Sequence, residues 1–221
     1  MEISQTLNTI LTLIGGVSWS IVYILVIFRS FRDKTYGMPF WALAFNIAWE
    51  FIFSFVLVPA TPGLQGTINQ VWFALDVVLV LTYVLYGRKE WPPRISKKLF
   101  YPYSILVLLV GYLFVYLLSV ELDHSQGMYA AFIQNLMMSV LFINMLNNRK
   151  SREGQSIGIA FFKMIGTLAP TIIFGMKSPF VLFLGSSCFV FDLIYLIMLT
   201  KVPKKSMMRT NDSITPHSSR I

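Results

Sequence analysis

The sequence predicts an all-α, multi-pass membrane protein with seven transmembrane helices, and three observations support this prediction. Hydrophobic residues make up 56% of the 221 residues and charged residues only 13%, whereas soluble domains carry about 25% charged residues. About seven apolar runs each approach the roughly 20 residues that a helix needs to cross a bilayer. The basic residues gather in every second loop. We therefore expect one helical bundle in a membrane.

The apolar runs are expected to form the helices in chain order. Their ranges are 7–28, 38–60, 68–86, 100–120, 128–146, 157–174 and 179–200. The second run ends at a turn indicated by Pro59 and Pro62, and Pro92 and Pro93 break the chain between the third and fourth runs. The sixth run is the least regular, because it contains Lys163, Gly166 and Pro170.

The end of the chain differs in composition from the rest. Residues 201–221 are polar and basic, with Ser, Thr, Asn and Pro, and such segments bury too little apolar surface to fold. We therefore divide the chain into a seven-helix domain over residues 1–200 and a disordered tail over residues 201–221.

The charge distribution predicts the orientation in the membrane. The loops after the first, third and fifth runs and the tail hold nearly all of the basic residues, whereas the opposite side has only Lys177 with Glu2, Glu121 and Asp123. Cytoplasmic loops are enriched in Lys and Arg, so we expect the N-terminus outside and the C-terminus in the cytosol. This explains the net charge of +8 without a nucleic-acid surface. The membrane would be the endoplasmic reticulum in a eukaryote or the plasma membrane in a bacterium.

Three acidic residues, Glu50, Asp76 and Asp192, lie inside apolar runs, where a charge costs roughly 2.5 to 3.5 kcal/mol. Lys163 is the one basic residue inside such a run. We expect it to extend to the interface, which is about 9 Å away along the helix. One basic residue cannot pair with three acids, so at least two of the acids must be neutral, hydrogen-bonded or in contact with water. A neutral buried carboxyl group is a proton donor.

Helical spacing gives each acid a polar neighbour. Asn46 lies four residues before Glu50 and Trp72 four before Asp76, so each pair shares a helix face and can form a hydrogen bond. For Glu50 we favour function over packing, because Gln would bridge helices at a lower insertion cost. For Asp76, with an indole beside it, a supporting role is equally consistent.

The last helix and the fifth helix add further polar candidates. Tyr195 follows Asp192 by three residues, and its hydroxyl group can tune or relay the proton of that carboxyl group. We favour a functional role for Asp192 as well. Gln134 and Asn135 could line a cavity or only bridge helices.

Aromatic residues are abundant at depth, and their faces stabilise cations. Trp49 and Phe191 are the candidates for this role, although packing explains any single aromatic residue as well. The sequence has no HExxH motif, no Cys/His cluster, no nucleotide-binding loop and no Asp-rich cluster suited to magnesium and diphosphate. We therefore expect no metal and no cofactor.

These motifs resemble the integral-membrane terpene cyclases of meroterpenoid and indole-diterpene pathways. The resemblance is carried by Asn46–Trp49–Glu50, by Trp72–Asp76, by Phe191–Asp192–Tyr195 and by the segment from Gly154 to Thr167. It implies that Glu50 and Asp192 are the essential acids. We assign Glu50 as proton donor or co-donor and Asp192 as its partner or the donor itself, and from its neighbours we expect Asp76 to orient or support the site. The resemblance also implies that a terminal epoxide or alkene of a prenylated substrate is protonated, without a metal, and that the resulting cation cyclises.

Two other functions remain open on the residues alone. A proton-coupled small-molecule transporter would also place acids near the middle of the membrane, although the first and last three helices show no convincing repeat. A receptor or scaffold is disfavoured by the short loops. The expected partners are a lipophilic substrate and the bilayer, with no nucleic acid and no obligatory protein partner.

Overall fold

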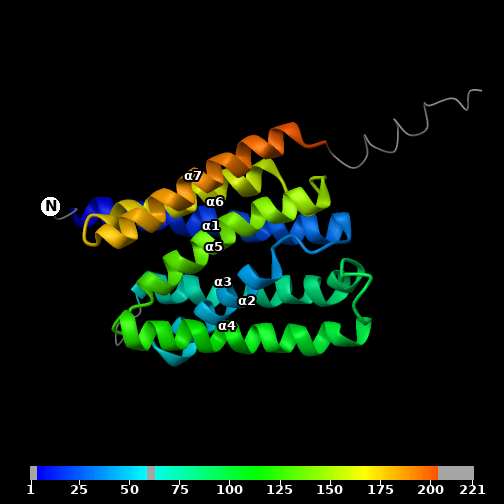
Figure 1. Ribbon diagram of the computed structural model, residues 1–221. Coiled ribbons are helices and arrows are strands. Elements are labelled where there is room, and N and C mark those ends of the chain that lie inside the picture. Colours follow the sequence, from blue (N-terminus) through cyan, green and yellow to red (C-terminus); the bar gives the residue numbers. More distant parts are fainter. Residues whose placement is uncertain (1–3, 59–62, 204–221) are drawn as a thin grey trace, which may run out of the picture.

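The computed structural model describes residues 4–58 and 63–203, and it is helical with no strand in these ranges (Figure 1). The helices are α1 (Gln5–Asp33), α2 (Phe40–Phe51), α3 (Gly63–Tyr86), α4 (Phe100–Leu122), α5 (Met128–Arg149), α6 (Ile157–Gly175) and α7 (Pro179–Lys201). A π-helix, η1 (Ile52–Val56), continues α2, and two short 3₁₀ helices, η2 (Gly87–Lys89) and η3 (Lys97–Leu99), lie between α3 and α4. The turn at Pro59 and Pro62 falls outside the described residues, as does the tail from residue 204 on.

Six of these helices are long and apolar enough to cross a membrane. The second apolar segment, Phe40–Val56, is shorter than the other six, and α2 has only 12 residues before the π-helix begins. The all-α prediction is confirmed, and the protein is an integral membrane protein. Seven complete membrane crossings, and the orientation of the termini, stay predictions.

The helices form two neighbouring groups (Figure 1). One contains α1, α5, α6 and α7, and the other contains α2, α3 and α4. In one group α6 packs against both α1 and α7, and α7 packs against α5. In the other, α2 packs against α3 and α4, and it also contacts α5. Most side chains of α2 are therefore buried, whereas the accessible faces of α4 are covered with large apolar side chains that suit lipid. The polar residues of α2 consequently face protein.

Short-range signals set the helix ends. The side chains of Ser156 and Ser178 accept hydrogen bonds from the backbone of the first turns of α6 and α7, as N-cap residues do. Pro179 follows in the first turn of α7. Gly127 precedes α5 with a φ of 73°, a conformation that glycine adopts without strain. Local sequence thus explains where the helices begin.

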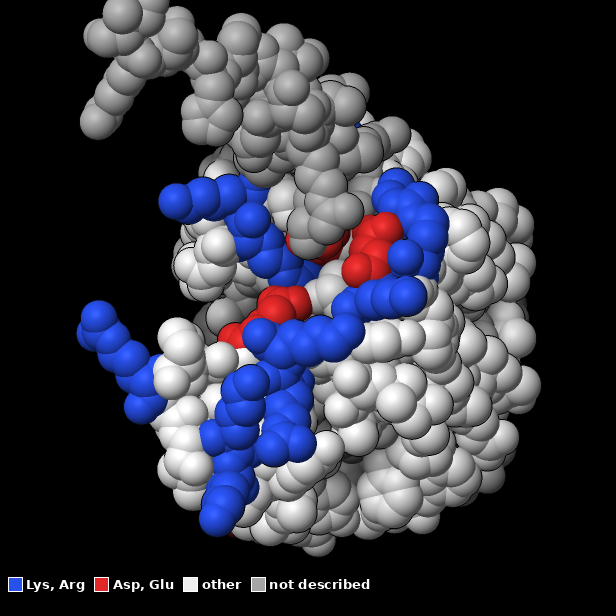
Figure 2. Space-filling model, turned by 90° about the vertical axis from the view of Figure 1, so that its right-hand side faces the viewer, with Lys and Arg blue, Asp and Glu red and all other residues white. Residues whose placement is uncertain are grey.

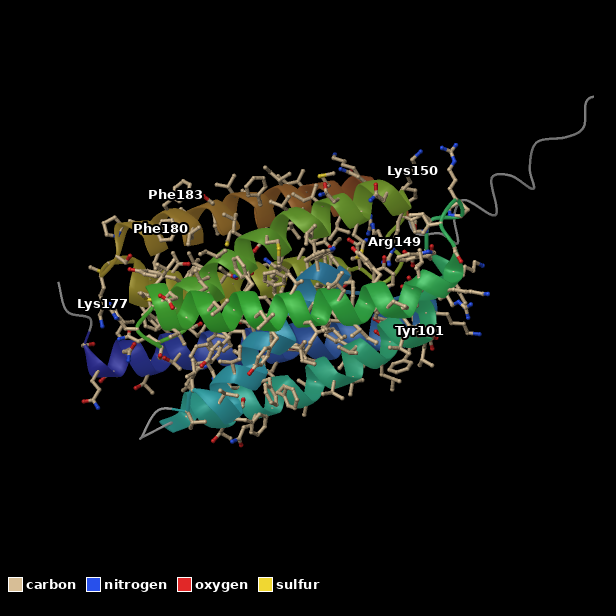
Figure 3. All side chains as sticks on the ribbon, turned by 60° about the horizontal axis from the view of Figure 1, so that its bottom comes forward. Tyr101, Arg149, Lys150, Lys177, Phe180 and Phe183 are labelled. Carbon is tan, nitrogen blue, oxygen red and sulfur yellow. The ribbon has the colours of Figure 1, made fainter. Side chains whose placement is uncertain are left out.

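Lys and Arg gather at one end of the bundle (Figure 2). This end holds the loops after α1, α3 and α5, with Arg149 and Lys150 there and Lys177 at the other end (Figure 3). Arg149 pairs with Glu90 at 2.9 Å, and its guanidinium lies 4.5 Å from the ring centroid of Tyr36. These contacts tie the loops after α1 and α3 to the end of α5, on the face that we predict to be cytosolic.

Candidate active site

A cavity of about 290 Å³ lies among α1, α2, α3, α5 and α6. It begins at the end of the bundle opposite the basic loops, where Gln65 on α3 and Gln126 before α5 line it. Inward, its wall is aromatic and polar. That part of the wall includes Trp19, Tyr23, Asn46, Trp49, Glu50, Trp72, Gln134, Asn135 and Met138. Such a mixture of apolar wall and few polar groups is typical of a small-molecule site.

Glu50 is the acid that lines the cavity in the described part of the chain, and one of its carboxyl oxygens has no hydrogen-bond partner there. Its side chain is 3% exposed, and Oε2 has no partner among the described residues. Glu50 precedes the π-helix η1 by two residues, and π-helical turns are frequent at functional sites. The neighbouring Trp49 donates its indole N–H to the carbonyl oxygen of Gly127 at 2.8 Å. This bond fixes the end of α2 against the start of α5 and holds Glu50 at the cavity.

Asp76 lies in a hydrogen-bond network that joins three helices. Asn46 donates to Asp76 Oδ2 at 2.7 Å and also contacts the Tyr23 hydroxyl group, which in turn lies 3.5 Å from the same carboxyl oxygen. The expected hydrogen bond between Asn46 and Glu50 is wrong, because Asp76 on the facing helix takes up the amide. Asp76 is close enough to Glu50 for the two carboxyl groups to interact electrostatically.

Trp72 shares a helix with Asp76 but does not bind it. Its indole N–H donates to Ser20 Oγ at 3.1 Å, so the predicted Trp72–Asp76 hydrogen bond is also wrong. The reason is that α1 lies beside α3 and offers a hydroxyl group. Trp72 instead lines the cavity, with its ring 6.1 Å from that of Tyr23.

Asp192 is held by Lys163. The lysine Nζ lies 2.8 Å and 3.0 Å from the two carboxyl oxygens and 2.6 Å from Ser139 Oγ. Both charged side chains are fully buried. The expectation that Lys163 extends to the interface is therefore wrong, because a carboxylate and a hydroxyl group satisfy the ammonium inside the bundle. In the described part of the chain, the cavity wall includes Glu50 and not Asp192.

The other candidates on α7 also lie outside the cavity wall as the described residues form it. Tyr195 is fully buried, and its hydroxyl group donates to Gln155 Oε1 at 2.8 Å and not to Asp192. Phe191 is half-buried. The structure thus brings Asn46, Trp49, Glu50, Trp72 and Asp76 together and leaves the α7 residues behind α5 and α6.

Sequence reasoning missed two residues of α1. Trp19 and Tyr23 both line the cavity, and Trp19 packs where Gly166 leaves room, since a Cβ there would lie 2.8 Å from the indole. Their spacing of four residues on one helix face was the available signal. No pattern in the sequence pointed to Ser139, which binds Lys163. Within the described ranges no three His, Cys, Asp or Glu side chains gather as metal ligands.

Comparison with known proteins gives a consistent result. Residues 2–205 match the family described as Pyr4-like transmembrane terpene cyclases. The chain is 31% identical to the Pyr4-family terpene cyclase mfmH of Annulohypoxylon moriforme over 74% of this chain and 68% of the relative. It is 27% identical to the terpene cyclase pyr4 of Aspergillus fumigatus over 86% and 84%, and 33% identical to the terpene cyclase macJ of Penicillium terrestre over 74% and 64%.

Proposed function

The chain belongs to the Pyr4-like transmembrane terpene cyclases and is a membrane terpene cyclase, and from this premise we propose that Glu50 starts the reaction as a proton donor. The substrate is a lipophilic, prenylated molecule of the meroterpenoid type, with a terminal epoxide or alkene. One observation carries the proposal: Glu50 is the buried acid that lines an aromatic cavity with an unpartnered carboxyl oxygen.

Two features keep the proton on Glu50. First, apolar surroundings penalise a charged carboxylate. Second, Asp76 lies nearby, and two neighbouring carboxyl groups cannot both be charged without strong repulsion. Asp76 accepts hydrogen bonds from Asn46 and Tyr23, which hold its carboxyl group in place on α3. Asp76 therefore supports the acid, and Asn46 and Tyr23 support Asp76.

The chemistry is an isomerisation. The Glu50 proton goes to the epoxide oxygen, the bond from that oxygen to the more substituted carbon breaks, and the nearest alkene forms the first ring bond. With an alkene trigger, the proton goes to the terminal carbon instead. Further alkenes attack in turn, the last cation loses a proton, and the Glu50 carboxylate regains one. No external electron donor is needed, and the proposed initiation requires no metal.

Aromatic side chains would stabilise the cations along this path. Trp19, Trp49, Trp72 and Tyr23 line the cavity, and an aromatic face stabilises a cation by about 0.5 to 2 kcal/mol. The shape of this wall would fold the polyene before it reacts. Trp49 thus keeps its proposed role, whereas Phe191 lies away from the cavity wall.

Asp192 acts through Lys163 in this proposal. The ion pair and Ser139 join α5, α6 and α7, and α5 and α6 supply Gln134, Asn135 and Thr167 to the cavity. Asp192 is then a positioning residue that neutralises a buried ammonium. Its loss would disturb one wall of the cavity without removing the proton donor.

The transporter alternative is not supported, because the whole-chain matches are to terpene cyclases. The test is to express the protein in membranes and supply farnesylated phenols with and without a terminal epoxide. We expect a cyclised product with the mass of the substrate. In deuterated water, an alkene trigger places one deuterium on carbon, whereas an epoxide trigger places it on an exchangeable hydroxyl group. Consumption of no polyene by well-expressed protein would refute the proposed substrate class.

A further inference from the structure

Two side-chain amide oxygens in the cavity wall have no hydrogen-bond partner among the described residues. Gln134 and Asn135 on α5 both line the cavity, and the described residues offer no partner to Gln134 Oε1 or Asn135 Oδ1. Gln134 is only 6% exposed. Buried amide oxygens are nearly always hydrogen-bonded in proteins. Because both oxygens belong to residues of the cavity wall, a molecule bound in the cavity can supply their missing partner.

The orientation of Asn135 defines what kind of ligand group fits. Its Nδ2 donates to Thr167 Oγ1 at 2.7 Å, so the amide nitrogen is directed to α6 and the carbonyl oxygen is the free end. A carbonyl oxygen only accepts hydrogen bonds. The missing group is therefore a donor, and a hydroxyl group also suits Gln134, whose amide can both accept and donate.

The prenyl part of the substrate has no such donor. A polyene has no polar hydrogen, and an epoxide only accepts hydrogen bonds. The donor must come from the polar head group to which the prenyl chain is attached. Resting on the proposed function, we propose that Gln134 and Asn135 form the head-group site, which binds a phenolic or enolic hydroxyl group of the substrate.

This placement has a consequence for the shape of the bound substrate. Glu50 reaches the cavity from α2, and the two amides reach it from α5. A substrate whose head binds the amides while its far end meets Glu50 must fold within one cavity. Ring closure requires a folded chain of this kind. The head-group site therefore selects the substrate and helps to preorganise it.

The experiment compares an ortho-farnesylphenol, epoxidised at its terminal alkene, with the methyl ether of the same compound. For the wild type we expect kcat/KM to be about tenfold higher for the free phenol, the magnitude of one hydrogen bond. In Gln134→Met, which keeps the side-chain length but leaves Asn135 in place, this preference should decrease through a higher KM for the phenol. Met137→Leu on the same helix, outside the cavity wall, is the matched control and should keep the preference.

Binding is measured separately so that the outcomes remain distinct. The non-epoxidised phenol should raise the Tm of the purified wild type more than its methyl ether does, and Gln134→Met should reduce this difference. If neither compound cyclises but the binding difference is present, the proposed reaction fails and the head-group site stands. If the wild type treats the phenol and its ether alike in both assays, as it would if only water occupied the site, the inference is overturned.

Discussion

At the scale of single residues, three intramembrane acids turn out to have three different surroundings. Glu50 lines a cavity with an unpartnered oxygen, Asp76 accepts hydrogen bonds from Asn46 and Tyr23, and Asp192 pairs with Lys163. The sequence alone showed that three acids lie inside apolar runs and that only one base accompanies them. It could not predict these partners, because each belongs to another helix far away in the chain.

The Asp192–Lys163 pair gives the first prediction. Asp192→Asn leaves an ammonium buried without a counter-charge, and breaking a buried pair in this way costs about 3 to 5 kcal/mol. We expect a clear fall in Tm and in cyclase activity. The double variant Lys163→Met with Asp192→Leu removes both charges and should recover most of the Tm.

Activity of the double variant then decides the role of Asp192. A positioning role predicts that activity returns with the fold, to at least about a tenth of the wild type, as expected when a buried pair is replaced by apolar side chains. A well-folded double variant with no measurable cyclisation would show instead that Asp192 or Lys163 takes part in the chemistry directly.

At the scale of helices, the apolar runs predicted the positions of α1 to α7 to within a few residues at most ends. The larger differences are at the end of α1 and the start of α3, which each lie five residues from the predicted end, and in the second run, which the structure divides into α2 and the π-helix η1. Hydrophobicity does not distinguish the two, because a π-helix needs the same apolar side chains. The change of helix type two residues after Glu50 was therefore not predictable from composition.

Close packing of α6 and α7 gives a prediction at this scale. A Cβ on Gly185 would lie 2.2 Å from Thr171 Oγ1, and the threonine is itself held by a hydrogen bond to the Thr167 carbonyl oxygen at 2.7 Å. Gly185→Ala should therefore destabilise the protein by about 1 to 3 kcal/mol, seen as a lower Tm.

The matched control is Ser186→Ala, at the next and exposed position of α7, which should leave the Tm unchanged. An unchanged Tm in Gly185→Ala would mean that α6 and α7 can separate without loss, and so would contradict the close packing described above.

At the scale of the whole molecule, the basic loops and the outer part of the cavity lie at opposite ends of the bundle. The basic loops gather at one end (Figure 2), and the cavity begins at the other, near Gln65 and Gln126. From the positive-inside rule we predict that the end of the cavity near Gln65 lies on the non-cytosolic side. Sequence alone predicted the charge asymmetry, but not the cavity, which depends on how five helices pack.

This orientation is tested by cysteine labelling in sealed vesicles, against the single buried Cys188 as background. An impermeant maleimide should reach Lys177→Cys from the non-cytosolic side and Lys97→Cys from the cytosolic side. Both positions are exposed and lie in loops or short turns at opposite ends. The orientation would be refuted if both cysteines were labelled from the same side, or if each were labelled from the side opposite to the one predicted.

The central claim is that the Glu50 carboxyl group supplies the proton, and the most direct measurement is the cyclisation rate of Glu50→Gln in membranes with matched amounts of folded protein. Gln keeps the shape of the side chain but has no acidic proton, so the rate should fall by about 10² to 10⁴-fold. Glu121→Gln, an exposed position at the end of α4, should keep the wild-type rate. A Glu50→Gln enzyme that cyclises its substrate within a few-fold of the wild-type rate would contradict the account.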